Sequence, residues 1–203
     1  MLLRNRIPRI EAVQASATEG HEHLPSTAID VISWLGASRI DYVLVGSVAR
    51  AIRGDASARG PVAIVPAPYG RNLDRLARAL WSARARLRTE AAPGLVAAAA
   101  DTVPVKLDAE KLLRAERWTL RCGEHDLDIE GHPAGSPRYQ ELLYESSRFE
   151  VASDVSVEVA APEDIEHYDH VRRTGVVPEI TVSRGTGLDP TAAPHPDSHH
   201  GSE

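Results

Sequence analysis

Apolar residues in the first third of the chain recur with periods that predict helices and strands in alternation. A helical spacing follows Ser26 or Thr27, either of which we expect to cap a helix that ends at Gly36. The segments DYVLV, SVARAI and PVAIV then predict a strand, a short helix stopped by Gly54, and a second strand with Pro61 at its first position. Because both strands are continuously apolar, we expect them to be buried.

The middle of the chain begins with a longer amphipathic pattern. From Asn72, which we expect to be the cap, apolar residues recur at helical spacing as far as Leu87 and predict one helix with a buried face. Residues 91–104 have no clear period, and a short helix capped by Asp108 follows them. This part of the chain therefore predicts two helices and leaves residues 91–104 unassigned.

Two hairpins and two helices are predicted farther along. RWTLRC and DLDIEG form a hairpin through Gly123, and RFEVA and VSVEVA form another at residues 153–154. A helix capped by Ser136 lies between the hairpins, and a helix with Pro162 in its first turn follows the second. The order of elements indicates an α+β (α/β-type) domain, in which helices flank a small mixed sheet.

Polar segments rich in glycine and proline enclose this domain. We expect residues 25–173 to form the domain, residues 1–24 to be weakly ordered, and residues 174–203 to be a disordered tail. Hydrophobic residues make up 42% of the 203 residues, which is enough for a core, and no apolar stretch is long enough to span a bilayer. A cytoplasmic protein that does not bind membranes is the expectation.

Charge and cysteine content narrow the possible partners. The formal net charge of −6 argues against general affinity for nucleic acids. Residues Arg71–Arg88, however, contain six arginines and one aspartate, a local charge of +5. A basic helix there could contact RNA phosphates or a protein partner, although a solvated helix face is the simpler interpretation. The single Cys122 cannot form an internal disulfide, and we expect it to be a small apolar residue in a strand.

A turn between the first two predicted strands carries a family resemblance. VLVGSVARAIRG places Gly46 and Ser47 between a strand and a helix, GPVAIVP follows, and DLDIE comes later. These stretches resemble bacterial minimal nucleotidyltransferase-fold proteins, in particular the branch that includes the nucleotidyltransferase toxins of toxin–antitoxin systems. The resemblance covers residues 29–170 and implies a nucleotidyltransferase-like fold, with Gly46 and Ser47 as the turn that binds the nucleotide's phosphates.

The family signature also requires carboxylates, and most of them are missing here. The Gly-Ser turn is followed by two aspartates on one strand and later by a third. They hold the Mg²⁺ ions that neutralise charge while a hydroxyl attacks the α-phosphorus of an NTP. In this chain Pro61 and Ala63 fall at the first two positions and Asp128 falls at the third. Proline and alanine have no side-chain oxygen, and one carboxylate cannot organise two metal ions.

Three functions follow as hypotheses. The leading one is a catalytically degenerate protein, a pseudoenzyme without a cofactor, that acts in regulation by binding a nucleotide or phosphate near Gly46, Ser47 and Asp128, or by binding RNA or a partner protein. The second is an active transferase that needs Mg²⁺ and moves a nucleotide from NTP to RNA, protein or a small acceptor. The third is an interaction module that binds no nucleotide, in which Gly46 and Ser47 form only a tight turn and Asp128 is a structural acid.

The second hypothesis needs substitute carboxylates. Asp55, in the loop before the second strand, and Glu130 could complete a rearranged one-metal site with Asp128. We expect Glu130 to share the face of Asp128 and Asp126 to point to the opposite face of the strand. Because catalytic geometry tolerates only small displacements, this site is less favoured than the degenerate one.

Overall fold

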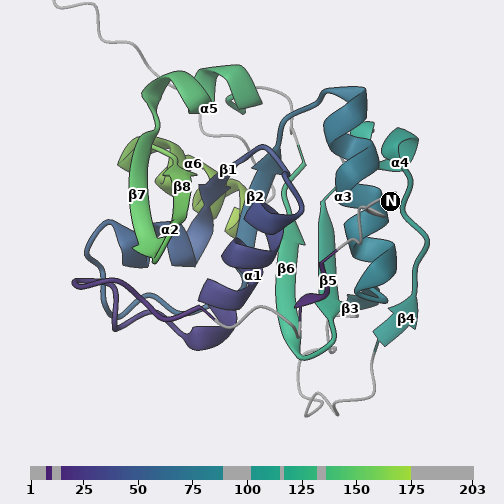
Figure 1. Cartoon of the computed structure of the whole chain (residues 1–203). Helices are drawn as coiled ribbons and strands as arrows, with labels where there is room; N and C mark the ends of the chain where they lie inside the picture. The colour runs from purple at the N-terminus through teal and green to yellow at the C-terminus, as the bar shows by residue number, and fades with distance from the viewer. Residues whose placement is uncertain (1–7, 11–14, 89–101, 115–116, 132–135, 175–203) are drawn as a thin grey trace, which may run out of the picture.

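The strands form one mixed sheet, which confirms the predicted mixed class of helices and strands. The computed structural model describes residues 8–10, 15–88, 102–114, 117–131 and 136–174. Within these residues eight strands are hydrogen-bonded in the order β4-β3-β5-β6-β2-β1-β8-β7, so the sheet is larger than the small one that we expected. Figure 1 shows β3, β4 and α3 at one side of the molecule and β7, β8, α2 and α6 at the other.

All the predicted helices and strands are present in the predicted order, and β3 and β4 are two further strands that were not predicted. The helices are α1 Ser26–Ala37, α2 Gly46–Ile52, α3 Gly70–Ser82, α4 Ala109–Leu113, α5 Tyr139–Glu145 and α6 Pro162–Thr174. The strands are β1 Tyr42–Val45, β2 Val62–Pro66, β3 Arg86–Arg88, β4 Thr102–Pro104, β5 Trp118–Cys122, β6 His125–Ile129, β7 Ser147–Ala152 and β8 Val155–Val159.

The centre of the sheet consists of β1, β2 and β6. β1 pairs antiparallel with β2, and β2 pairs parallel with β6. Every residue of β1 and β2 is buried, as their continuous apolar sequences predict. α1 contacts β2 and β6, and α2 contacts β1, β2 and α6. The hydrophobic core therefore surrounds the strands from which the Gly46 turn and Asp128 extend.

Both predicted hairpins are present. β5 and β6 are antiparallel and connect through Gly123, which adopts a φ of 62°. β7 and β8 are antiparallel and connect at Asp154, whose φ is 60°. Glycine and aspartate are among the residues that tolerate this left-handed backbone at little cost, so the turn signals in the sequence were reliable.

The long helix predicted from Asn72 to Leu87 is wrong. α3 ends at Ser82, and Arg84 turns the chain with a φ of 51°. Leu87 lies in β3, opposite Leu120 of β5 and Val103 of β4. The arginines of Arg71–Arg88 therefore do not form one basic helix, because the last of them belong to a turn and a strand. Apolar positions spaced by a few residues suit either structure, which is why the boundary was missed.

Three of the predicted helix caps are also wrong. Ser26 is the first residue of α1 and Asn72 is inside α3. α5 begins after Arg138, and the Ser136 hydroxyl contacts His167 instead. Asp108 does cap α4, because its carboxylate accepts a hydrogen bond from the Lys111 backbone N–H. A capping residue type predicts that a helix is near more reliably than it predicts the first residue.

The described parts of the N-terminal segment pack on the domain. Trp34 Nε1 donates a hydrogen bond to the Pro8 carbonyl, and Ile10 is buried. The Thr18 backbone N–H donates to Val151 O at 3.1 Å. Residues 175–203, where we expect a disordered tail, lie outside the described residues. None of the helices described here is long and apolar enough to cross a membrane.

Candidate functional site

The strand register brings three of the predicted site positions together. Ala63 of β2 pairs with Val45 of β1 on one side and with Asp128 of β6 on the other. Gly46 directly follows Val45, so the Gly46 turn, Ala63 and Asp128 lie side by side on three neighbouring strands. Positions far apart in the sequence thus converge, although only Asp128 carries a carboxylate.

Gly46 occupies a position that strongly favours glycine. Its φ is 70°, and a Cβ atom there would lie 3.1 Å from Ala63 Cβ and 3.1 Å from Arg172 Nη2. The Arg172 guanidinium, from α6, therefore covers the turn closely. A Cβ on Gly60 would lie 2.8 Å from Ser47 Oγ, so the Ser47 hydroxyl lies against the residue before Pro61.

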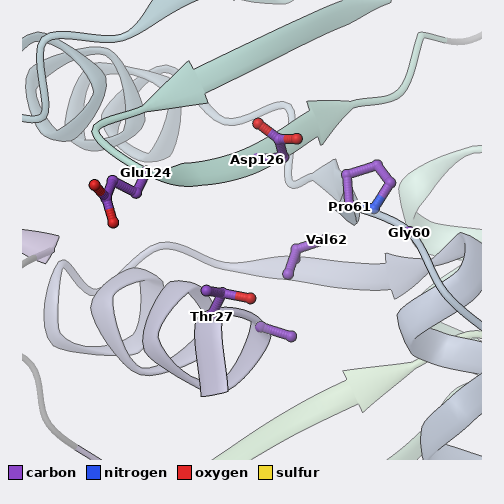
Figure 2. A pocket seen from close by; sticks show the side chains of 7 residues that line it. Thr27, Gly60, Pro61, Val62, Glu124 and Asp126 are labelled. Atoms are coloured by element: carbon purple, nitrogen blue, oxygen red, sulfur yellow. The ribbon is translucent and has the colours of Figure 1, made fainter. Parts of the chain in front are cut away.

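Pro61 lies just before β2 and lines a hollow of about 240 Å³. Figure 2 shows its ring near Val62, with Asp126 beyond it and Thr27 of α1 across the hollow. The ring presents only carbon to this space, where the family signature expects an oxygen ligand. Pro61 therefore forms part of the wall of the hollow and cannot bind a metal ion.

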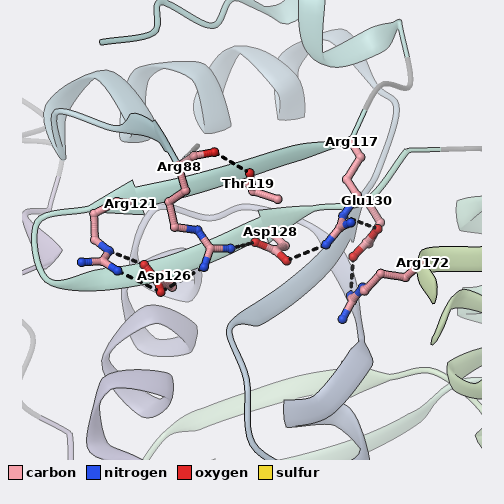
Figure 3. Close-up of polar contacts among 8 residues, drawn as sticks. All are labelled: Arg88, Arg117, Thr119, Arg121, Asp126, Asp128, Glu130 and Arg172. Atoms are coloured by element: carbon pink, nitrogen blue, oxygen red, sulfur yellow. Dashed lines mark hydrogen bonds and ion pairs between the residues drawn. The ribbon is translucent and has the colours of Figure 1, made fainter. Parts of the chain in front are cut away.

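Asp128 is buried and neutralised by arginine. Its side chain is 2% exposed and forms ion pairs with Arg88 Nη2 of β3 and with Arg117 Nη2, the latter at 3.2 Å. Arg88 Nη1 also contacts Asp126 at 3.0 Å, so one guanidinium bridges both aspartates (Figure 3). The expectation that Asp126 faces away from Asp128 is wrong, because side chains two residues apart on a strand share a face.

Glu130 continues the same row of charges. Its side chain is 6% exposed, forms an ion pair with Arg117 Nε at 3.4 Å and accepts a hydrogen bond from Arg172 Nη2. Burial alone would lower the pKa of Arg172, but the charge and hydrogen bond of Glu130, with Asp128 and Asp169 nearby, raise it. Arg172 is therefore held in its charged form over the Gly46 turn.

Arginine and carboxylate side chains alternate through the whole site, as Figure 3 shows for most of the row. At one end Arg121 pairs with Asp126, and at the other Asp169 pairs with Arg172 and Arg50. We call this row the ion-pair network, and its members in order are Arg121, Asp126, Arg88, Asp128, Arg117, Glu130, Arg172, Asp169 and Arg50. It has five positive and four negative groups, so it retains one positive charge.

The residues present do not fit a two-metal site. Mg²⁺ needs hard oxygen ligands, and the carboxylates of Asp128 and Glu130 are already engaged by guanidinium groups. Asp55 accepts hydrogen bonds from the hydroxyl and backbone N–H of Ser57, which lower the pKa of its carboxyl. No contact joins Asp55 to Asp128, and the described residues contain no group of three or more potential metal ligands.

Cys122 plays no part in the site's polar contacts. It lies fully buried in β5, as predicted. Burial, with a smaller contribution from Asp126, raises the pKa of its thiol to about 12. The thiol therefore stays protonated near neutral pH and is a poor nucleophile.

No family model matches this chain, and a search of curated proteins gives no significant match. What the site can do is therefore inferred from its own residues. Fixed guanidinium groups beside a glycine turn are suited to holding phosphate oxygens. They do not lower the pKa of an attacking hydroxyl in the way that a bound metal ion does.

Proposed function

We propose that this chain is a nucleotidyltransferase-fold protein that binds a phosphate-bearing ligand, such as a nucleotide, without transferring it. The observation that carries the proposal is the pairing of Asp128 with Arg88 and Arg117. At the position where the resemblance places the third metal ligand, two guanidinium groups take up the carboxylate's charge. The ion-pair network thus occupies the site that Mg²⁺ would need.

The strand register supports the fold part of this proposal. The Gly46 turn, Ala63 and Asp128 lie on three adjacent strands, and β2 runs parallel to β6. A nucleotidyltransferase-like fold would bring these three positions together, so their meeting on adjacent strands supports the proposal. The convergence favours a shared ancestry over a chance match of a Gly-Ser dipeptide.

Arg172 supports the binding part. Its Nη2 lies against Gly46 and also pairs with Glu130, and its side chain is still 19% exposed. A phosphate at the turn would accept two parallel hydrogen bonds from this guanidinium in exchange for Glu130. Because the network retains a positive charge without a metal, such binding should not require Mg²⁺. The proposed role of the protein is therefore to bind a phosphate-bearing ligand in regulation and not to catalyse a reaction.

Calorimetry with each NTP, with and without Mg²⁺, tests the proposal. We expect binding that does not depend on the metal and that weakens about tenfold, or 1.4 kcal/mol, in Arg172→Ala. Arg173→Ala is the matched control, because Arg173 is the neighbouring arginine on α6 and its Nε donates to the Asp169 carbonyl, away from the Gly46 turn. Arg172→Lys keeps the charge beside Glu130 but loses the planar fork, so its binding should fall while its melting temperature stays near that of the parent.

Two results would overturn the proposal. Robust transfer from a labelled NTP with Mg²⁺ or Mn²⁺, abolished by Asp128→Ala, would establish an active transferase. Absence of NTP binding both with and without metal would establish an interaction module that binds no nucleotide.

A further inference from the structure

A second hollow, remote from the Gly46 turn, lies where α3 ends and β3 begins. It has a volume of about 980 Å³ and is lined by the end of α3, the turn after it, β3, the end of β4 and Arg9. Its side chains include Trp81, Arg84, Arg86 and Val105. We call it the α3–β3 pocket. None of its arginines belongs to the ion-pair network, so it is a separate feature of the molecule.

Trp81 is exposed in a way that the core does not explain. Its relative exposure is 70%, although the α3 residues Leu76 and Leu80 are buried and Trp34 of α1 is fully buried. Trp81 also lines a smaller neighbouring hollow of about 400 Å³, whose charged residues include both bases and acids: Arg78, Lys106, Asp74 and Asp108. The indole therefore borders two hollows, and the α3–β3 pocket is the one whose described charged residues are all basic.

The charged residues that line the α3–β3 pocket within the described part of the chain are all basic: Arg9, Arg84 and Arg86. Arg86 is oriented by hydrogen bonds from its Nε to Thr102 Oγ1 and from its Nη2 to the Thr102 carbonyl, both 2.7 Å. Among the described residues, no acidic side chain pairs with any of these arginines. In a chain with a net charge of −6, a hollow whose described charged residues are all arginines is a local exception.

The backbone fixes two of these arginines in place. Arg9 lies between Pro8, whose carbonyl accepts from Trp34 Nε1 at 3.1 Å, and the buried Ile10. Arg84 has a φ of 51°, and its N–H donates to the Trp81 carbonyl at 3.1 Å. The side chains of Arg84 and Trp81 therefore leave the same turn of backbone.

We propose that the α3–β3 pocket binds single-stranded nucleic acid. A base would stack on the Trp81 indole while Arg84 and Arg9 hold the phosphates on either side, the combination that single-strand binding proteins use. Trp81 presents an exposed aromatic face for this, and arginine pairs with phosphate oxygens in a bidentate manner. An acidic peptide would engage the arginines but leave the exposed indole without a partner, so it is disfavoured.

Fluorescence anisotropy with a labelled oligouridine RNA tests this proposal at low and moderate salt. Trp81→Ala and Arg84→Gly should each weaken binding at least about fivefold, and Arg84→Gly should also flatten the salt dependence. Glycine suits the positive φ at residue 84, so this variant removes the charge and keeps the turn. Quenching of tryptophan fluorescence by the RNA should disappear in Trp81→Phe.

Arg39→Gly is a matched control for Arg84→Gly. Arg39 is exposed, follows α1 as Arg84 follows α3, and has a φ of 56°. Its N–H donates to Gly36 O at 2.8 Å, in the same pattern as Arg84 to Trp81 O. Both variants therefore lose the same charge from the same backbone conformation, and only Arg84→Gly should lose affinity.

The outcomes separate this proposal from its rivals. Tighter binding of single-stranded RNA or DNA than of a duplex of the same length supports stacking, and comparison of the two single strands shows which is preferred. Equal losses in Arg84→Gly and Arg39→Gly would reveal nonspecific attraction and overturn the proposal. It would also fail if Trp81→Ala bound normally, if no RNA bound at low salt, or if polyglutamate displaced the RNA as well as unlabelled RNA does. Arg172→Ala should bind RNA normally, which keeps this test independent of the proposed function.

Discussion

Gly46 combines two constraints at the scale of a single residue, because it has both a positive φ and close neighbours. We predict that Gly46→Ala lowers the free energy of unfolding by about 2–4 kcal/mol, from left-handed strain and from overpacking against Ala63 and Arg172. Gly36→Ala is the matched control: residue 36 is exposed within α1 and has nothing within 4 Å of a Cβ. Gly36→Ala should raise the free energy of unfolding by about 0.5–1 kcal/mol, because alanine is the better helix former. Urea denaturation of both variants measures the difference, and a neutral Gly46→Ala would contradict the packing.

Glu130 is the buried carboxylate between two arginines. Replacing it with glutamine keeps the shape and removes the charge, which leaves Arg117 and Arg172 sharing fewer carboxylates in a poorly hydrated site. We predict that Glu130→Gln lowers stability by about 3 kcal/mol in chemical denaturation. Glu110→Gln breaks a well-exposed pair with Arg114 and should change stability by less than about 0.5 kcal/mol. If Glu130→Gln lowers stability as little as Glu110→Gln does, the network contributes nothing to folding.

At the scale of elements, one side chain fixes α3 to the start of β1. The buried amide of Asn72 accepts from Asp41 N at 2.8 Å and donates to the carbonyls of Asp41 and Ala67. Asn72→Ala would leave these backbone groups without their partner, so we predict a loss of about 2–3 kcal/mol. Arg71→Ala, at the exposed neighbouring position, should stay within about 0.5 kcal/mol. Thermal denaturation followed by circular dichroism compares the two, and equal melting temperatures would contradict this assignment.

The elements also show which sequence signals are reliable. Continuous apolar runs predicted β1 and β2, and the Gly123 turn predicted the β5–β6 hairpin, because these signals are local. The end of α3 was missed because Leu87 was assigned to the helical spacing before it, although arginine and apolar residues alternate over residues 84–88 with the period of a strand. The role of Asn72 was missed because its partners precede it by many residues. Local sequence patterns therefore predicted that these helices and strands exist, and long-range contacts decided where they end.

At the scale of the whole molecule, the candidate site consists of segments that the sequence keeps apart. Asp128 could be predicted from its apolar neighbours and from the family resemblance. Arg88, Arg117 and Arg172 could not, because they come from β3, the residue before β5, and α6, with no mutual spacing to recognise. Only the folded sheet brings them to the same carboxylates. The decisive fact about the site, that arginines take up its negative charge, is therefore a property of the tertiary structure.

The whole-molecule arrangement leads to a prediction about restoring the metal ligands. Pro61→Asp with Ala63→Asp adds the carboxylates of the family signature, but Arg172 Nη2 and Ala63 Cβ lie against the same point, each 3.1 Å from a Cβ placed on Gly46. We predict that millimolar Mg²⁺ or Mn²⁺ does not raise the melting temperature of this double variant, because the guanidinium pairs with the new carboxylate first. Adding Arg172→Met should allow metal binding and raise the melting temperature by about 2–4 °C for each kcal/mol gained. The same triple variant with asparagine at residues 61 and 63 is the uncharged control and should not respond. If the double variant alone responds as strongly as the triple variant, Arg172 does not occupy the metal's place.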